Sequence, residues 1–558
     1  MDFTCSASTI HGSQFWGSFP KLKGKSEKIP FFVFYSSPSL GMWSSYITLA
    51  ILIGSVGCVF RRCFSRRLPL PPGPKPLPLI GNLHQLPRKD LLREYHRWSS
   101  IYGPIIYMHI VGRQFIILNS LKVIVDLFEK RSSIYSTRPR LVMAGELVGR
   151  DDTSVLFLKY GSRLKACRQI MHNWMGPKAV AKVYPQQDQG ANLLLANLLE
   201  TPEKFSRHIR ANAGSLVLKF GYGIQCAGSE DPWILMSEEL SKITSTASQP
   251  GRWLVDSLPF LRYLPRWIPG TKFLEYAEAS RRVNMNVLRL PFERVKDQIR
   301  EGTAQPSWTS NALLADGVAE MTPDQLYALQ VSAGSLYAGG IETVVATIRT
   351  FILMMARHPE VQRKAQAEID SVVGIRRLPN INDKEQLPFV GQVIKEVYRI
   401  NPVAPLVPHS LDIDDVYEGY RIPKGAWVMA NMWAVFHDPE AYSEPDTFNP
   451  ERFLETPTHQ AEMDPTPLAF GVGRRFCPGY HFALSFVFLN VAQILSVFDI
   501  CPMVDKEGRE LVPPPKFDLG HLSIPSEFDC SIKPRSAEKA SLVQDIVATL
   551  QPAQPPAN

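Results

Sequence analysis

The sequence has few cysteines, and their spacing excludes two common uses of this residue. Its eight cysteines are scattered over 558 residues, with no CxxC pair and no repeated spacing. Disulfide-dependent secreted domains and zinc modules with paired cysteines both show regular spacings. The sequence therefore argues against a disulfide framework and against a zinc cluster, and it favours a body in a reducing, cytosol-facing compartment.

Acidic residues are scarce near the N-terminus. The whole chain carries a formal charge of +8, whereas residues 1–75 contain nine basic and two acidic side chains. That segment accounts for +7, so the remainder of the chain is close to neutral at +1. Positive charge beside an apolar stretch is typical of a membrane surface, because anionic headgroups attract it. The basic balance therefore does not indicate nucleic-acid binding.

Charge is absent altogether between Ile29 and Phe60. Within this stretch, the 18 largely apolar residues 43–60 are just long enough to cross the hydrocarbon core of a bilayer. We expect a single transmembrane anchor here, with the body in the cytosol because four arginines follow directly. A cleaved signal peptide is the alternative, although no small-residue cleavage site follows. Residues 1–41 form an extension of unclear role, and Met42 is a possible start of translation.

No repeat and no low-complexity linker divides the long part of the chain that follows. Residues 61–79 form a basic and proline-rich hinge, which is incompatible with a helix and typical of a semi-rigid spacer. Residues 80–535 form one large unit, the expected catalytic domain, and residues 536–558 form a C-terminal tail rich in Pro, Ala and Gln at its end.

Helical periodicity dominates the large unit. Apolar residues recur at three- and four-residue spacing over 325–358, 360–373 and 384–400, and Pro359 ends the first of these stretches. Strand-like runs appear at 105–118, with Gly112-Arg113 as the turn signal. We predict a mainly α body with a small β portion.

The strongest local pattern surrounds Cys477. The segment Phe470-Gly-Val-Gly-Arg-Arg-Phe-Cys-Pro-Gly479 precedes a long apolar run of helical composition. We expect Pro478 at the first position of that helix, where proline is favoured. Amides at a helix N-terminus lower the pKa of a nearby thiol and favour a thiolate. An inert buried cysteine is the alternative, and the uncharged run 476–498 could also be a second transmembrane helix.

This segment matches F-x-x-G-x-R-x-C-x-G at every fixed position and resembles the signature loop of the cytochrome P450 superfamily. The resemblance covers roughly residues 70–535 and implies the P450 fold, a single large helical domain with small β-sheets. It implies haem b as cofactor, with Cys477 as the iron ligand through an axial thiolate. The loop residues that it assigns to cofactor binding are Phe470, Gly473, Arg475 and Gly479, the arginine pairing with a haem propionate.

Two adjacent glycines, Gly339 and Gly340, lie inside the predicted helix 325–358. Each costs about 1 kcal/mol relative to alanine in a helix interior, so their presence needs a reason. The stretch Ala338-Gly-Gly-Ile-Glu-Thr343 resembles the P450 segment that passes over the haem and leaves room for dioxygen. By this resemblance Thr343 is the alcohol that hydrogen-bonds dioxygen, and Glu342 is the acid that relays protons. Without that context the pair would be an ordinary solvated Glu-Thr.

A buried charged triad is implied by three further residues. Glu396 and Arg399 are three residues apart and share one face of the predicted helix 384–400. An E-x-x-R pattern alone has no diagnostic value, since one is expected in most chains of this length. In the P450 pattern Arg452 joins this pair and locks the cysteine loop, so we assign the three residues a structural role.

Two more cofactor contacts follow from the resemblance. His409 comes after a proline-rich stretch at a position where the family often has a propionate-binding His or Arg, a surface histidine being the alternative. The segment from Tyr160 to Arg168 resembles the family helix that usually reads W-R-x-x-R, but Leu164 stands in the Trp position. Arg168 and Lys165 are then expected to hold the propionate without an indole N–H, which would lower haem affinity.

A narrower resemblance involves a segment rich in aromatic residues and prolines. Residues Gln249 to Asp256 and Leu258 to Gly270 resemble the fungal secondary-metabolism branch of the superfamily. That branch oxidises polyketides, terpenoids and related aromatic skeletons. The aromatic side chains of this segment could equally dip into a membrane near a substrate entrance.

The resemblance as a whole implies a haem-thiolate monooxygenase that inserts one oxygen atom from O₂ into a hydrophobic small molecule. It implies electrons from NADPH through a separate cytochrome P450 reductase, and a location in the endoplasmic reticulum membrane. The expected partners are this reductase, the substrate, O₂ and membrane lipid, without nucleic acid. By position in the resemblance alone, the expected substrate pocket comprises Leu141, Val142, Met143, Leu336, Tyr337, Val403, Ala404 and Leu406.

Two other functions share parts of this pattern. A haem-thiolate isomerase or peroxygenase-like enzyme would keep the cysteine loop but would not need the pair Glu342-Thr343. A non-catalytic haem-binding membrane protein would be expected to have lost Thr343 or the triad. Because this sequence keeps all of these residues, we favour the monooxygenase.

Overall fold

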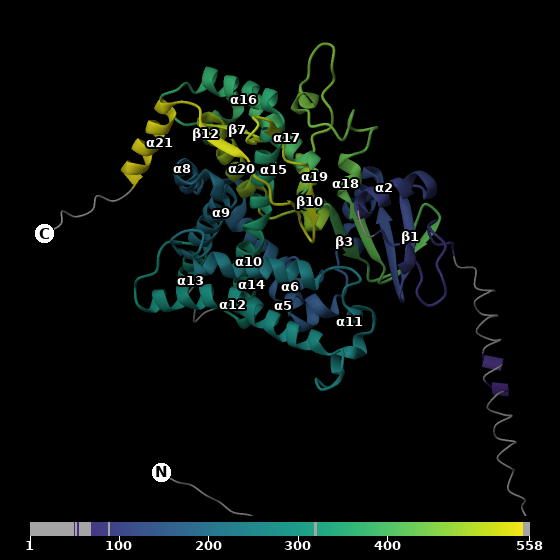
Figure 1. Ribbon diagram of the computed structural model, residues 1–558. Helices are drawn as coiled ribbons and strands as arrows, with labels where there is room; N and C mark the ends of the chain where they lie inside the picture. Colours follow the sequence, from purple (N-terminus) through teal and green to yellow (C-terminus); the bar gives the residue numbers. More distant parts are fainter. Residues whose placement is uncertain (1–48, 51–52, 55–67, 88–89, 317–320, 551–558) are drawn as a thin grey trace, which may run out of the picture. The chain divides into compact units, whose positions relative to one another are not determined.

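The computed structural model describes residues 49–50, 53–54, 68–87, 90–316 and 321–550. Contacts group the chain into two units, Met1–Arg67 and Leu68–Asn558. The expected anchor at 43–60 lies outside the described residues except for two helical pairs, and the extension at 1–41 lies wholly outside them. The second unit holds the helices from α2 onward and the strands (Figure 1).

Helices make up most of the second unit. Its α-helices are α2 (Leu91–Tyr102), α3 (Leu121–Ile124), α4 (Ser132–Tyr135), α5 (Arg150–Thr153), α6 (Ser162–Met175), α7 (Pro177–Ala181), α8 (Tyr184–Glu200), α9 (Phe205–Tyr222), α10 (Pro232–Ala247), α11 (Leu254–Ser257), α12 (Lys272–Arg300), α13 (Trp308–Asp316), α14 (Pro323–Gly340), α15 (Glu342–Arg357), α16 (Pro359–Val372), α17 (Pro388–Ile400), α18 (Met432–Phe436), α19 (Thr466–Ala469), α20 (Tyr480–Val497) and α21 (Ala537–Leu550). Two π-helical turns are η2 (Val125–Lys130) and η3 (Val142–Leu147). Short 3-10 turns are η1 (Leu83–Gln85), η4 (Pro202–Lys204), η5 (Pro259–Tyr263), η6 (Ile381–Gln386), η7 (Pro450–Phe453) and η8 (Gly473–Arg475).

Local sequence explains where several long helices begin. Thr322 accepts a hydrogen bond from the backbone N–H of Gln325, whose side chain in turn accepts from the N–H of Thr322, and this capping box starts α14. Asp231 accepts from the N–H of Trp233 and starts α10. In both helices a proline occupies the first position, where its missing N–H costs nothing.

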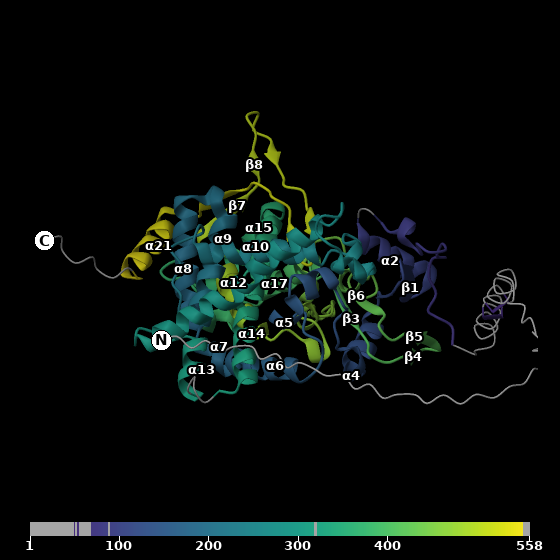
Figure 2. The ribbon, with the colours of Figure 1, turned by 90° about the horizontal axis from the view of Figure 1, so that it is seen from below.

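The strands form one four-stranded sheet and several two-stranded ladders. The sheet has the order β1 (Ile105–Ile110), β2 (Arg113–Leu118), β6 (Trp427–Asn431), β3 (Leu406–Ser410), and only the pair β2 and β6 within it is parallel. The ladders pair β4 (Asp415–Tyr417) with β5 (Tyr420–Ile422), β7 (Phe498–Cys501) with β12 (Ser531–Pro534), β8 (Met503–Val504) with β9 (Glu510–Leu511), and β10 (Phe517–Leu519) with β11 (Ser523–Pro525). Figure 2 shows the hairpin that carries β8 projecting away from the helices.

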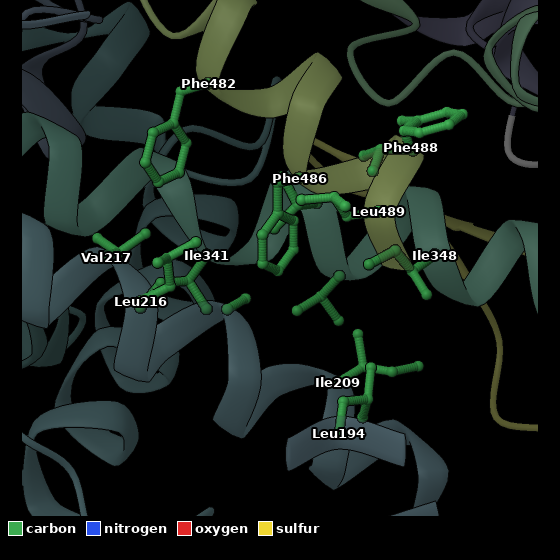
Figure 3. Close-up of a cluster of buried hydrophobic side chains, with 14 of the residues drawn as sticks. Leu194, Ile209, Leu216, Val217, Ile341, Ile348, Phe482, Phe486, Phe488 and Leu489 are labelled. Carbon is green, nitrogen blue, oxygen red and sulfur yellow. The ribbon is translucent and has the colours of Figure 1, made fainter. Parts of the chain in front are cut away.

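The main apolar core lies where α8, α9, α15 and α20 meet. Figure 3 shows Leu194 of α8, Ile209 and Leu216 of α9, Ile348 of α15 and Phe486 of α20 pointing toward one another. All five side chains are buried. Full burial of such a side chain contributes about 1.5–3 kcal/mol to folding. This core holds together the helices that carry the candidate site residues.

Two helical stretches in the described part of the chain are apolar and long enough to cross a membrane, Pro323–Arg357 and Tyr480–Val497. In each, 78% of the most apolar window is buried inside the protein. A helix surrounded by other helices needs the same composition as a membrane span. The alternative that 476–498 forms a second transmembrane helix is therefore wrong, because α20 is a core helix.

The prediction of a mainly helical body with a small sheet is confirmed, with local corrections. The helix predicted over 325–358 is interrupted at Ile341, between α14 and α15. The helix predicted over 384–400 begins only at Pro388, after the turn η6. The predicted hairpin over 105–118 turns at Val111 and Gly112, both with positive φ, and not at Gly112-Arg113.

Candidate active site

Cys477 lies in the loop between η8 and α20. Its backbone N–H donates to the carbonyl oxygen of Phe470 at 2.9 Å and so closes the loop. The ring of Phe470 meets Tyr398 and Tyr480 edge-on, with centroid distances of 5.5 and 5.0 Å. These contacts fix the segment before the cysteine.

Gly473 lets the loop approach a neighbouring turn. Its φ is +62°, and a Cβ atom at this position would clash with the carbonyl oxygen of Phe128 in η2. Only glycine satisfies both conditions. Gly479 has an ordinary φ of −84°, and a Cβ there would lie 3.8 Å from Sγ of Cys477.

The helix after the cysteine starts later than its sequence suggests. α20 begins at Tyr480 with Gly479 as its N-cap, so Pro478 lies before the helix and the predicted start is wrong. Burial raises the pKa of the Cys477 thiol, while the backbone N–H of Gly479 and the charge of Arg168 act in the opposite direction. The expected net lowering by helix amides is therefore not found, because burial outweighs it.

Arg475 joins the cysteine loop to the segment before α6. Its Nε donates to the carbonyl oxygen of Ser136 at 2.7 Å, and its Nη1 and Nη2 donate to those of Val155 and Leu158 at 3.1 and 2.5 Å. Burial, with the charges of two nearby arginines, lowers the pKa of Arg475 to about 9. This arginine forms no ion pair with a described carboxylate, and it keeps its positive charge at neutral pH.

The helix α6 presents one of its two expected cofactor residues to the loop. Arg168 donates from Nη2 to the carbonyl oxygen of Phe476 at 2.8 Å, directly beside Cys477. Lys165 is exposed, with its ammonium 5.4 Å from the ring centroid of Tyr160. Leu164, in the usual Trp position, is 1% exposed and belongs to the main core.

His409 lies in β3 and is buried, so the alternative of a surface histidine is wrong. Its ring stacks on Phe128 with a centroid distance of 4.0 Å, and neither ring nitrogen has a hydrogen-bond partner among the described residues. Burial and the charges of Arg138 and Arg475 hold the pKa of His409 well below its usual range. The imidazole is therefore neutral at physiological pH.

Arg138 is a basic residue of this region that sequence reasoning missed. Its Nη1 donates to the carbonyl oxygen of Pro408 at 2.5 Å and its Nε to that of Leu156 at 2.9 Å. Burial lowers its pKa to about 10. Its only signal in the sequence is an arginine directly before Pro139, which by itself indicates no function.

Glu342 lies at the break between α14 and α15 and is 4% exposed. Arg210 of α9 donates to both carboxylate oxygens, from Nε to Oε1 at 3.0 Å and from Nη2 to Oε2 at 3.2 Å. Arg210 also lies 3.8 Å from Glu238 of α10. The acid that the sequence singles out is thus a buried carboxylate held by an arginine from another helix.

Thr343 follows directly and donates from Oγ1 to the carbonyl oxygen of Gly339 at 2.9 Å. Gly339 itself is exposed, and a Cβ there would meet nothing within 4 Å. A Cβ on Gly340, by contrast, would press against Val217 of α9 at 3.1 Å. Of the two glycines, Gly340 is needed for helix packing, while Gly339 leaves space open beside Thr343.

The structure brings Glu396, Arg399 and Arg452 into contact, all of them at most 2% exposed. Arg399 donates from Nε and Nη2 to the two oxygens of Glu396 at 2.7 and 2.8 Å. Arg452 donates from Nε to Glu396 at 3.2 Å and from Nη1 to Glu462 at 2.6 Å. Remaining donors of Arg399 reach backbone carbonyl oxygens, among them that of Phe436 at 2.8 Å.

Four of the expected pocket residues occupy two separate apolar clusters. Val142 and Met143 of η3 are fully buried in a cluster that includes side chains of α10, α11 and α12. Leu336 and Tyr337 belong to the main core, where the hydroxyl of Tyr337 donates to the carbonyl oxygen of Trp233. The side chain of Tyr337 therefore packs between α14 and α10.

The other four expected pocket residues are half-buried. Leu141 and Leu406 pack at the edge of a cluster on the four-stranded sheet. Val403 accepts a hydrogen bond from the backbone N–H of Ser523 at 2.8 Å, which ties it to β11, and Ala404 is its neighbour. The eight expected pocket residues are therefore distributed over several separate clusters and segments.

The residues around Cys477 fit a haem. Arg138, Arg168 and Arg475 form no ion pair with a described carboxylate, and both nitrogens of His409 lack partners. Uncompensated buried cations cost several kcal/mol each, and the two propionates of a haem would compensate them. In the described part of the chain no cluster of three or more His, Cys, Asp or Glu side chains could hold a metal ion. A single thiolate ligand from Cys477 is the arrangement that this donor set supports.

Known proteins resemble this chain over most of its length. The family model described as "Cytochrome P450" matches residues 71–526. Cytochrome P450 monooxygenase claR of Ampulloclitocybe clavipes is 42% identical over 483 residues, which cover 86% of this chain and 89% of that protein. Cytochrome P450 monooxygenase COX2 of Coprinopsis cinerea is 40% identical, with 86% and 92% covered.

A further relative carries the name of its reaction. Tryptamine 4-monooxygenase of Psilocybe cyanescens is 38% identical over 508 residues, which cover 88% of this chain and 98% of that protein. The match to the family model spans the cysteine loop, the helix break at Glu342 and the triad. The chain therefore belongs to the cytochrome P450 family and is a haem-thiolate monooxygenase similar to those of fungi.

Proposed function

We propose that this monooxygenase inserts one oxygen atom from O₂ into an unactivated C–H bond of a hydrophobic small molecule, in a step of terpenoid, polyketide or aromatic secondary metabolism. The observation that supports it most is the joint presence of the Cys477 loop, with its uncompensated arginines, and of the pair Glu342-Thr343 at a helix break. Relatives named as monooxygenases in fungal species support the metabolic setting.

A haem held by a thiolate supplies reductive activation of O₂, and thiolate donation favours cleavage of the O–O bond. In this proposal Cys477 is the thiolate ligand. Arg138, Arg168 and Arg475 bind the propionates by charge-assisted hydrogen bonds, and neutral His409 donates a further one. Phe470, Gly473 and Gly479 would shape the loop that holds the haem through Cys477. Lys165 is proposed as a further propionate contact, although its side chain is exposed on α6.

Glu342 and Thr343 handle protons in the proposed reaction. Thr343 can turn its hydroxyl from the carbonyl oxygen of Gly339 toward the space that Gly339 leaves open. The ion pair with Arg210 orients the carboxylate of Glu342, which in this proposal accepts a proton and passes it on. The triad of Glu396, Arg399 and Arg452 holds the cysteine loop in place and has a structural role.

We infer that electrons come from NADPH through a separate reductase that docks on the cysteine side. The chain is proposed to be anchored by residues 43–60 in the endoplasmic reticulum membrane, with the domain at 80–535 facing the cytosol. Substrate is proposed to lie among the walls that Leu141, Val142, Met143, Leu336, Val403, Ala404 and Leu406 contribute, with Tyr337 behind them.

Product analysis with isotopic oxygen tests the proposal. The purified chain, a P450 reductase and NADPH are incubated under ¹⁸O₂ with a panel of terpenoid, polyketide and indole skeletons. One ¹⁸O atom per product and one NADPH per turnover are expected, and Thr343→Ala should lower product formation per NADPH consumed. A product that forms without NADPH or without ¹⁸O would instead indicate an isomerase or a peroxygenase-like enzyme.

A further inference from the structure

Several buried or largely buried arginines form no ion pair with a described carboxylate. Burial lowers the pKa of Arg138, Arg150, Arg168 and Arg475, and none of them forms an ion pair with a described Asp or Glu. Arg138, Arg168 and Arg475 lie around the Cys477 loop, where the two propionates of a haem and the thiolate would offer them negative charge. Arg150 makes no hydrogen bond to that loop, so its charge needs a different explanation.

Arg150 is the first residue of α5 and only 5% exposed. Its Nη1 donates to Oδ1 of Asn284 in α12 at 2.9 Å, and its Nη2 lies 3.4 Å from the hydroxyl of Ser154. Its Nε has no partner. The guanidinium therefore uses only part of its donor capacity on neutral groups, and a buried cation left in this state costs several kcal/mol.

An aromatic ring lies near the guanidinium of Arg150, and the charge of Arg150 acts on an imidazole with an unpartnered nitrogen. The ring of Phe157 lies 5.6 Å from the guanidinium carbon. His521, in the turn between β10 and β11, has a buried Nδ1 without a partner. Burial and the charge of Arg150 lower the pKa of His521 to about 4, so the imidazole is neutral at physiological pH.

Backbone contacts connect the segments of these two residues to expected substrate-pocket residues. The backbone N–H of Val155, just after α5, donates to the hydroxyl of Ser335, which precedes Leu336. On the other side, β11 is hydrogen-bonded to Val403 through Ser523. Arg150 and His521 thus belong to segments that are hydrogen-bonded next to two of the expected pocket residues, Leu336 and Val403.

We propose that Arg150 and His521 bind the carboxylate of an acidic substrate whose remaining skeleton is apolar. This inference rests on the proposed function and names the substrate class of the same site. The free Nε and an adjacent Nη of Arg150 can donate in parallel to two carboxylate oxygens, and a neutral His521 can donate from Nδ1. One guanidinium balances one negative charge, which favours a carboxylate over a phosphate.

Ligand binding by matched probes tests this directly. Dodecanoate and 1-dodecanol share a chain length and differ in charge, and each is titrated by calorimetry and by the shift of the Soret band. The wild type should prefer dodecanoate, and Arg150→Met should lose about 10- to 100-fold in affinity for the acid with little change for the alcohol. Arg300→Met, at the exposed end of α12, is the matched control and should keep the preference.

Thermal unfolding without ligand separates binding from a structural role. Replacing an uncompensated buried cation by an apolar side chain of similar size should leave the midpoint unchanged or raise it. A wild type that does not bind dodecanoate, or an Arg150→Met variant that unfolds several degrees lower while keeping the preference for the acid, would overturn the inference. A normal spectrum of the reduced, carbon-monoxide-bound protein in either case would leave the proposed function standing. If that spectrum is missing in the wild type, calorimetry alone still decides the carboxylate site.

Discussion

Arg210 of α9 donates hydrogen bonds to both carboxylate oxygens of Glu342 in α15, at 3.0 and 3.2 Å. The side chain of Glu342 is 6% exposed and that of Arg210 18% exposed, so the pair is largely shielded from water. Beyond it, Glu238 lies 3.8 Å from Arg210 and pairs with the exposed Lys242. A line of charges therefore leads from the helix break at Thr343 toward solvent.

Loss of Arg210 should leave Glu342 as an uncompensated buried carboxylate. We expect Arg210→Leu to lower the free energy of unfolding by about 3 kcal/mol, and the double variant with Glu342→Gln to recover part of that loss. Chemical denaturation of the four species measures the coupling. As a control, Arg97→Leu removes an exposed pair with Glu94 and should change the free energy of unfolding far less than Arg210→Leu. Additive effects of the two changes would contradict the structural pairing.

Substitutions in the triad should lower the free energy of unfolding even more, because Glu396, Arg399 and Arg452 are almost completely buried. Glu396→Gln leaves the buried Arg399 without a counter-charge and leaves Arg452 with Glu462 alone, and we expect a loss of about 3–5 kcal/mol in unfolding free energy. Denaturation followed by far-ultraviolet circular dichroism measures it. A loss below about 1 kcal/mol would contradict the assignment of Glu396 as the counter-charge of Arg399.

The close approach of Gly473 to η2 should tolerate no side chain. In Gly473→Ala the methyl group meets the carbonyl oxygen of Phe128 and φ remains positive, so we expect destabilisation of about 3 kcal/mol. Gly508→Ala is matched, because Gly508 also has positive φ (+81°) but open space around it. It should cost only about 1 kcal/mol, from backbone strain alone. Equal thermal shifts for both variants would contradict the assigned contact.

Buried His437 should make the protein sensitive to acid. It stacks on Trp433 with a centroid distance of 4.0 Å, and burial with the charge of Arg399 lowers its pKa to about 3. In the unfolded chain a histidine binds a proton below about pH 6.5. The stabilisation is therefore complete above that pH and falls as pH drops toward 3, by up to about 1.4 kcal/mol per pH unit.

The variant His437→Phe keeps an aromatic ring but has no titrating group. Between pH 6 and pH 4 the wild type should lose roughly 2 kcal/mol more unfolding free energy than this variant. Urea denaturation at a series of pH values measures the difference. If the unfolding free energies of the two proteins changed in parallel with pH, the pKa of His437 would be the same in the folded and the unfolded chain. That result would contradict the prediction.

Local patterns predicted what depends on neighbours in the chain. The hairpin of β1 and β2 follows from its β-branched runs and from Gly112, and the helices α16 and α17 follow from apolar spacing. The break at Ile341 was not predicted, because helix periodicity continues across it and only the two glycines before it weaken the helix.

Local patterns could not predict contacts between residues that are distant in the sequence. Arg210 is 132 positions from Glu342, and Arg138 is 270 positions from the carbonyl group of Pro408 that it contacts. No spacing rule connects such residues, since only the packing of α9 on α15 and of the sheet on the loop brings them together. The burial of Cys477 also depends on packing between distant segments, so the sequence alone did not predict that burial raises the pKa of this thiol more than the backbone N–H of Gly479 lowers it.

The central claim concerns the iron ligand, and one spectrum tests it most directly. The difference spectrum of the reduced, carbon-monoxide-bound protein is recorded for the wild type, Cys477→Ala and Cys477→His. A Soret band shifted strongly to the red in the wild type and lost in both variants is the expected result for a thiolate-ligated haem. A wild type without this band, or a Cys477→Ala variant that keeps it, would contradict the assignment of Cys477.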